Sequence, residues 1–203
     1  LKVIDIIMLM APVGVFSLIA QTINKVVGNN LNQVIELLGA LGFYMFTLTL
    51  GLILHVAITY LSLLKFYTKM PIQTFLLGVS EEVSSFVLPL GATINMDGTA
   101  QYQAVAAVFI SQALGMDLSI ADQITIILTT VLASIGTAAV PAAGIMMLIV
   151  ILESIGVPSA GVALILGVDR ILDMVRTTVN VTGDAAVAVS VAASEKQLKT
   201  FGK

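Results

Sequence analysis

Residues 169–184 read DRILDMVRTTVNVTGD and carry five charged side chains inside a block, residues 162–193, that is otherwise rich in Val, Leu, Ile and Ala. If this block is a helix, a rotation of about 100° per residue puts its polar side chains on one face. That face holds Asp169, Asp173, Arg176, Thr177, Asn180 and Asp184, with Arg170 at its edge. Such a stripe is typical of a buried binding site, or alternatively of ion pairs that lock helices together. Three carboxylates exceed what Arg176 alone needs as a partner, which favours the binding site.

The composition around this stripe predicts an integral membrane protein. Of the 203 residues, 58% are hydrophobic and only 10% are charged, and the mean hydropathy is +1.07. A soluble domain carries about a quarter of its residues as charged side chains, so most of this surface must face lipid or other apolar helices. There is no cysteine, which excludes disulfides and thiolate chemistry. The chain begins at Leu1 without a separate signal peptide, and we expect it to be a piece of a longer protein.

The hydrophobic blocks predict an all-α polytopic membrane protein. Residues 123–152 contain no charge, and as one helix they would be roughly 45 Å long, against about 30 Å of hydrocarbon. Gly136, Pro141 and Gly144 favour a re-entrant hairpin of two short helices over one tilted, kinked helix. The expected parts are two transmembrane helices in residues 1–66, a polar segment at 67–82, a core at 83–195 and a basic tail at 196–203. The core comprises a helix at 83–115, the hairpin at 123–152 and a last helix at 162–194.

The distribution of lysines predicts how these segments are oriented, because cytoplasmic loops carry an excess of Lys and Arg. With a hairpin at 123–152, the outer face holds only Lys25, and its loop at 115–122 has no Lys or Arg. The cytoplasmic face then holds Lys2, Lys65, Lys69, Lys196, Lys199 and Lys203. A full crossing by residues 123–152 would put the three tail lysines outside, so the hairpin is favoured.

A second concentration of polar residues, NMDGT at 95–99, interrupts an apolar block. Unwinding a buried helix here would free the carbonyl oxygens of Gly91, Thr93 and Asn95 beside the Asp97 carboxylate. Hard cations bind such oxygens, and broken helices of transporters use them for coupling sodium ions. The alternative is a helix kink with a capping Asp97. A calcium loop of the EF-hand type is disfavoured because the spaced acidic ligands are lacking.

Asp184 supports the cation interpretation. No Lys or Arg lies within two turns of it on its own helix, so its buried carboxylate needs a positive charge from elsewhere. The carbonyls near Gly91 and Asn95 are themselves electron-rich. A sodium ion between these groups would balance both.

Other residues have plainer interpretations. His55, the only histidine, is expected to be a packing residue rather than a proton relay. Glu81 and Glu82 are expected in a solvated loop. Three glycines of the second block are expected at close helix contacts: Gly39, Gly42 and Gly51.

Three stretches, in order, resemble the dicarboxylate/amino acid:cation symporter family, the sodium-coupled glutamate and aspartate transporters. They are PLGATINMDGTA at 89–100, residues 133–144, and DRILDMVRTTVNVTGD at 169–184. The resemblance covers nearly the whole chain. It implies a truncated glutamate-transporter-like fold with an unwound helix at 83–115 and a re-entrant hairpin at 123–152. Residues 1–66 would be a scaffold helix and a transport-domain helix, and residues 83–195 the transport core.

The resemblance also implies roles for individual residues. Arg176 would hold the side-chain carboxylate of an acidic amino acid, Asp173 its amino group, and Asn180 and Thr99 its α-carboxylate, with Asp169 orienting Arg176. Met96 and Thr177 complete the implied substrate site, and Val140 and Gly144 belong to a tip that closes over it. Three sets of sodium ligands are implied: Gly91, Asn95 and Asn180 with Asp184; Thr93 with Ser134, Ile135 and Thr137; and Asn95 with Asp97.

By the same resemblance, the function is symport of sodium, the coupling ion, with glutamate or aspartate by an elevator-type alternating-access mechanism. Neither enzymatic activity nor an organic cofactor is expected. The implied partners are an acidic amino acid, sodium ions and the lipid bilayer, with no nucleic acid. The complete protein would be a homotrimer, multi-pass in the inner (plasma) membrane.

Two departures from the family pattern qualify these expectations. The family's first half is absent, and residues 67–82 lack its first re-entrant hairpin, which has a serine-rich tip. This polypeptide alone is therefore not expected to be transport-competent. A C4-dicarboxylate symporter, an ion channel and a purely structural fragment stay open as alternatives.

Overall fold

The computed structural model describes residues 31–67, 78–137, 140 and 143–198, together with six isolated positions, 9, 13, 14, 16, 17 and 20. The expected first membrane block, most of the polar segment at 67–82 and the tail beyond Leu198 lie outside the described residues. Within them the chain is helical, and the single strand-like contact is an isolated bridge between Val79 and Leu198. The expected all-α class is therefore confirmed for this part of the chain.

Three consecutive helical segments form one long rod. Helix α2 (Leu31–His55) passes into a π-helical turn, η1 (Val56–Tyr60), and then into α3 (Leu61–Tyr67). Among the described residues, Asn32–Phe66 is the one helix long and apolar enough to cross a membrane. At 35 residues it is roughly 52 Å long. Exposed Phe43, Phe46 and Ile53 line its outer side, as expected of a lipid-facing helix.

The glycines of this rod behave differently from one another. A side chain at Gly51 would collide with Gln101 of the neighbouring helix, so Gly51 does serve a close helix contact. Gly39 and Gly42 have no atom within 4 Å of the position a Cβ would occupy. The expectation of close packing at these two positions was wrong in the described part of the chain.

Helices α4 (Glu81–Ile94) and α5 (Asp97–Ala113) are separated by two non-helical residues, Asn95 and Met96. Ser80 caps α4, and Glu81 and Glu82 lie in its first turn rather than in a loop. The interruption is shorter than the five residues expected, since residues 97–99 already belong to α5. The Gly91 carbonyl is not freed, because it accepts a hydrogen bond from the Asn95 amide at 2.8 Å.

The uncharged block forms two helices, α6 (Ile120–Gly136) and α7 (Ala143–Ser154), packed against each other and against α5. A capping box between Ser119 and Asp122 starts α6. At its other end the Thr137 hydroxyl donates to the Ala133 carbonyl at 2.6 Å, which satisfies one terminal acceptor. A short 3₁₀ helix, η3 (Ser159–Leu164), leads into the 29-residue α8 (Leu166–Ser194).

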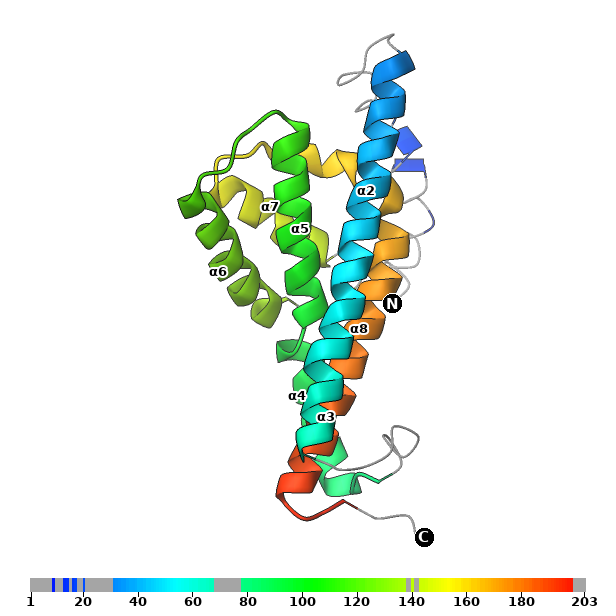
Figure 1. The fold of residues 1–203 in the computed structure, drawn as a ribbon, viewed down its shortest axis with the longest axis vertical. Coiled ribbons are helices and arrows are strands. Elements are labelled where there is room, and N and C mark those ends of the chain that lie inside the picture. The colour runs from blue at the N-terminus through cyan, green and yellow to red at the C-terminus, as the bar shows by residue number, and fades with distance from the viewer. Residues whose placement is uncertain are drawn as a thin grey trace.

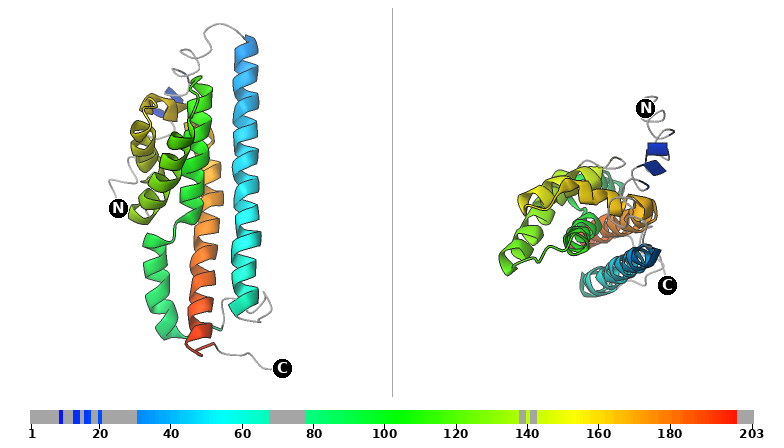
Figure 2. Two further views of the ribbon diagram at one scale, coloured as in Figure 1. Left: turned by 60° about the vertical axis from the view of Figure 1, so that its left-hand side comes forward. Right: turned by 90° about the horizontal axis from the view of Figure 1, so that it is seen from above.

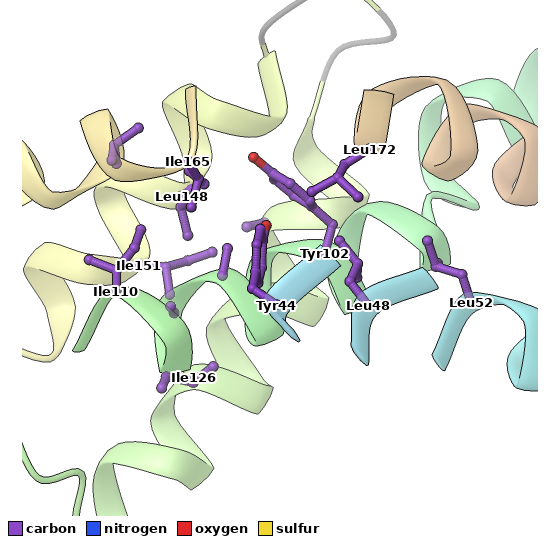
Figure 3. Packing of buried hydrophobic residues seen from close by; sticks show 14 of the residues in the cluster. Tyr44, Leu48, Leu52, Tyr102, Ile110, Ile126, Leu148, Ile151, Ile165 and Leu172 are labelled. Atoms are coloured by element: carbon purple, nitrogen blue, oxygen red, sulfur yellow. The ribbon is translucent and has the colours of Figure 1, made fainter. Parts of the chain in front are cut away.

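Helix α5 is central to the packing. It contacts α2, α6, α7 and α8, while α4 continues its line and packs on α8 (Figure 2). Figure 1 shows α8 beside the rod formed by α2, η1 and α3, with α6 and α7 on the other side of α5. The core gathers around α5, where Tyr102 and Ile110 meet Leu48 of α2, Leu148 of α7 and Leu172 of α8 (Figure 3). This packing brings the α4–α5 interruption and the α6–α7 link to the polar face of α8.

Candidate functional site

A cavity of about 300 Å³ lies where the α4–α5 interruption, the α6–α7 link and α8 meet. Twelve of the residues singled out from the sequence line it: Gly91, Asn95, Met96, Thr99, Thr137, Val140, Gly144, Asp173, Arg176, Thr177, Asn180 and Asp184. A larger apolar groove of about 360 Å³ between α2, α5 and α6 has no charged lining residue. We therefore take the polar cavity as the candidate site.

Among the described residues of the cavity wall, Arg176 is the one positive side chain, and it is only 5% exposed. Its Nη2 donates to the Asp173 carboxylate one helical turn earlier, and its guanidinium lies 4.5 Å from the centre of the Tyr102 ring. These two contacts fix the plane of the guanidinium. Its Nη1 is buried without a hydrogen-bond partner among the described residues.

Asp169 takes a different place from the one expected. Its carboxylate accepts a hydrogen bond from the Tyr102 hydroxyl at 2.5 Å, and it does not line the cavity. The carboxylate that directly holds Arg176 is that of Asp173. Asp169 can therefore act on Arg176 by fixing the ring of Tyr102 beneath it, besides the attraction between the two charges.

Asn180 connects α8 to the first turn of α5. Its amide nitrogen donates to Thr99 Oγ1 at 3.0 Å, and its amide oxygen accepts from the Gly98 backbone at 2.9 Å. Gly98 is required at this crossing, because a Cβ there would come within 2.9 Å of the Arg176 carbonyl. These two hydrogen bonds hold the first turn of α5, with Thr99, against Asn180 at the cavity wall.

Asp184 meets the interruption at the other end of the cavity. Its Oδ1 accepts from the Asn95 side chain at 3.0 Å and lies 2.5 Å from the position of a Cβ on Gly91. Only a glycine at 91 leaves room for this carboxylate. The set Gly91, Asn95, Asn180 and Asp184 is thus brought to one cavity, with oxygen atoms suited to a hard cation.

The other two expected ligand sets are not assembled in this way. Of the second set, Thr137 lines the cavity, whereas Thr93, Ser134 and Ile135 do not. The Thr93 and Ser134 hydroxyls donate to carbonyls of their own helices. Of the third set, Asn95 lines the cavity and Asp97 does not. The Asp97 carboxylate instead accepts hydrogen bonds from side chains of α2 and η1.

His55 makes a polar contact that sequence reasoning missed. Its Nε2 lies 2.6 Å from Asp97 Oδ2, so the expectation of a packing residue was wrong. Tyr60 donates its hydroxyl to the same oxygen. The available signal was Asp97 itself, a carboxylate in an apolar block that needs donors from a neighbouring helix.

An interrupted helix beside a cavity lined by charges of both signs is a feature found in membrane transporters. The model of the sodium:dicarboxylate symporter family matches residues 1–77 and 74–194, so the chain belongs to this family.

Relatives support the same assignment. The chain is 41% identical over 217 residues to the mouse excitatory amino acid transporter 3 and 37% identical over 211 residues to the proton/sodium-glutamate symport protein of Bacillus subtilis. These matches cover 91% and 92% of the chain but 40% and 48% of the relatives. A shorter match, 54% identical over 109 residues, joins 54% of the chain to 22% of an excitatory amino acid transporter of Caenorhabditis elegans. The chain thus spans less than half the length of these relatives.

Proposed function

We propose that the chain is part of a secondary active symporter that couples sodium entry to uptake of an acidic amino acid, glutamate or aspartate. The observation that carries this proposal is the Nη1 of buried Arg176, which has no hydrogen-bond partner among the residues that the structure describes. A buried charged donor without a partner typically costs about 1–3 kcal/mol or more. A substrate carboxylate is the partner that suits a planar guanidinium best.

The charges of the cavity support an amino acid over other anions. In the part of the lining that the structure describes, one side chain is positive, Arg176, and two are negative, Asp173 and Asp184. A C4-dicarboxylate would add two negative charges and leave Asp173 as a repulsive neighbour. An acidic amino acid adds one net negative charge. It also brings an ammonium group, from which the Asp173 carboxylate can accept a hydrogen bond.

Sodium completes the charge balance in this proposal. With an acidic amino acid bound, the negative charges on the wall and ligand outnumber the positive ones. An excess of charge of one sign is costly in a partly buried site, and bound cations would remove that cost. Asp184, Asn95, Asn180 and Gly91 are the proposed ligands of one sodium ion. The remaining proposed ligands, Thr93, Asp97 and residues 134–137, are supported by the family resemblance alone.

The mechanism follows from the parts that surround the cavity. The non-helical residues Asn95 and Met96 support an unwound membrane helix, and the packing of α6 on α7 supports a re-entrant hairpin whose tip, with Val140 and Gly144, covers the substrate. Elevator-type movement, a homotrimer and the inner (plasma) membrane are supported by family membership. The two parts of the family match meet at residues 74–77, within the segment proposed to lack the first hairpin. Because a chain without that hairpin is not expected to transport, substrate binding is the appropriate test rather than uptake.

The test is equilibrium binding of radiolabelled L-aspartate and L-glutamate to the protein in lipid nanodiscs, in sodium. Arg176→Ala should weaken binding by roughly ten- to a hundredfold, because the carboxylate loses its buried charged donors. Arg170→Ala is the matched control: it removes the same charge from the same helix at a side chain that is 69% exposed and whose contact with Asp173 is long, at 3.9 Å. Because an ion pair this exposed contributes little, the affinity should change by less than about threefold. Equal effects of the two variants, or stronger binding of succinate than of aspartate, would overturn the proposal.

A further inference from the structure

Two side chains of the long rod meet on one oxygen of Asp97. His55 Nε2 lies 2.6 Å from Asp97 Oδ2, and the Tyr60 hydroxyl donates to the same atom. A carboxylate has no proton to give, so Nε2 is the donor, and Nδ1 lies 3.4 Å from Thr59 Oγ1. The two rings are edge to face, with centroids 5.1 Å apart. Tyr60 is 4% exposed, whereas the side chains of His55 and Asp97 are 28% and 27% exposed, so the contact is partly buried.

The π-helical turn makes this double contact possible. Residues five apart in an α-helix point about 140° away from each other, so His55 and Tyr60 would not face the same partner. In η1 the Leu61 amide donates to the Val56 carbonyl, five residues earlier. That wider turn brings residues five apart close to one face, and such turns occur frequently at functional sites.

From Asp97 the contacts continue to the cavity. Asp97 Oδ1 accepts from the Gly98 amide at 3.0 Å, and the same amide lies 2.9 Å from the Asn180 side-chain oxygen. Asn180 in turn donates to Thr99. Tyr60 and Asn95 also fill the space that a side chain at Gly183 would need, so the rod, the interruption and α8 are interlocked at this point.

We infer that His55 and Tyr60 are positioning residues of the binding site: through Asp97 they fix the first turn of α5, and hence Asn180 and Thr99, at the cavity wall. The inference rests on the proposed function only in taking this cavity as the binding site. Both oxygens of Asp97 accept hydrogen bonds from the protein, so this carboxylate can anchor the first turn of α5 to the rod. A merely structural link between α2 and α5 would affect stability without changing affinity at the cavity.

Binding measurements separate these two roles. Tyr60→Phe and His55→Leu should each weaken L-aspartate binding at saturating sodium on the order of tenfold, as expected for loss of a hydrogen bond to a charged group. His55→Gln keeps a donor near the position of Nε2 and should recover most of the loss. Tyr44→Phe is the matched control, because the buried Tyr44 hydroxyl of the same rod has no partner among the described residues. Equal affinity in Tyr60→Phe and Tyr44→Phe would overturn the inference.

Hydrogen exchange supplies a readout that needs neither ligand nor sodium. In Tyr60→Phe and His55→Leu the Gly98 and Thr99 amides should exchange about tenfold faster than in the unmodified chain and in Tyr44→Phe. Unchanged exchange at these amides would also overturn the inference. If the unmodified chain binds no aspartate, the proposed function fails, while the exchange rates still decide whether His55 and Tyr60 hold the first turn of α5.

Discussion

At the scale of single residues, the site consists of charges whose partners the protein supplies only in part. Arg176 contacts Asp173 and the ring of Tyr102, but its Nη1 has no hydrogen-bond partner in the described part of the chain. Asp184 accepts one side-chain hydrogen bond, from Asn95, and has no ion pair among the described residues. The unpaired donor and the uncompensated carboxylate lie on the same wall, which is the arrangement expected if an anion and a cation bind together.

Asp184→Asn should therefore weaken the dependence of substrate binding on sodium. The substituted side chain keeps an oxygen that can accept from Asn95 but no longer attracts a cation, so the sodium concentration for half-saturation should rise by about tenfold or more. Asp117→Asn removes the same charge at an exposed loop position and serves as control. If Asp184→Asn and the unmodified chain reach half-saturation at the same sodium concentration, Asp184 is not a ligand of the coupling ion.

The sequence predicted the polar stripe well and the anchor at Asp97 not at all. The residues of the stripe lie on one helix, so the helical period alone decides that Arg176, Asn180 and Asp184 reach one wall. The contact between His55 and Asp97 joins residues 42 apart and depends on how two helices cross and on a π-helical turn. Neither feature has a signal in the local pattern.

At the scale of elements, the interruption between α4 and α5 is held by its neighbours rather than by its own sequence. The expected break at residues 95–99 is reduced to Asn95 and Met96. The reason is that the Gly98 amide, in the first turn of α5, donates to the side-chain oxygens of Asp97 and Asn180. One of these acceptors belongs to α8. The sequence could therefore predict that the helix is interrupted here but not where α5 resumes.

Gly98→Ala should push α5 and α8 apart. Its Cβ would lie 2.8 Å from the Asn180 oxygen and 2.9 Å from the Arg176 carbonyl, which cannot move aside, so we expect a loss of about 1–3 kcal/mol in stability. Gly136→Ala, where no atom lies within 4 Å, should change stability by less than about 1 kcal/mol. Thermal unfolding in detergent measures both variants, and equal midpoints would show that the α5–α8 crossing is not this tight.

At the scale of the whole molecule, basic residues gather at one end. The end of α3, which carries Lys65, lies with the start of α4 and the end of α8, which Lys196 follows, at the bottom of Figure 1. The α5–α6 connection, with Asp117, lies towards the other end. This arrangement agrees with a cytoplasmic face at the lysine end and with residues 123–152 entering and leaving from the opposite side.

Labelling of introduced cysteines tests this orientation, since the chain has no cysteine of its own. Lys196→Cys should react with a membrane-impermeant maleimide only when the cytoplasmic side is accessible, and Asp117→Cys only from the other side. Labelling of both positions from one side would refute the proposed re-entrant hairpin.

Linkage between sodium and the substrate is the central claim, and it is tested most directly by the affinity for L-aspartate at different sodium concentrations. The protein in nanodiscs is titrated with aspartate from about 1 to about 100 mM sodium, with choline keeping ionic strength constant. Because each ligand supplies charge that the other needs at Arg176 and Asp184, the dissociation constant should fall by at least about tenfold over this range. A dissociation constant that stays the same throughout would contradict the account.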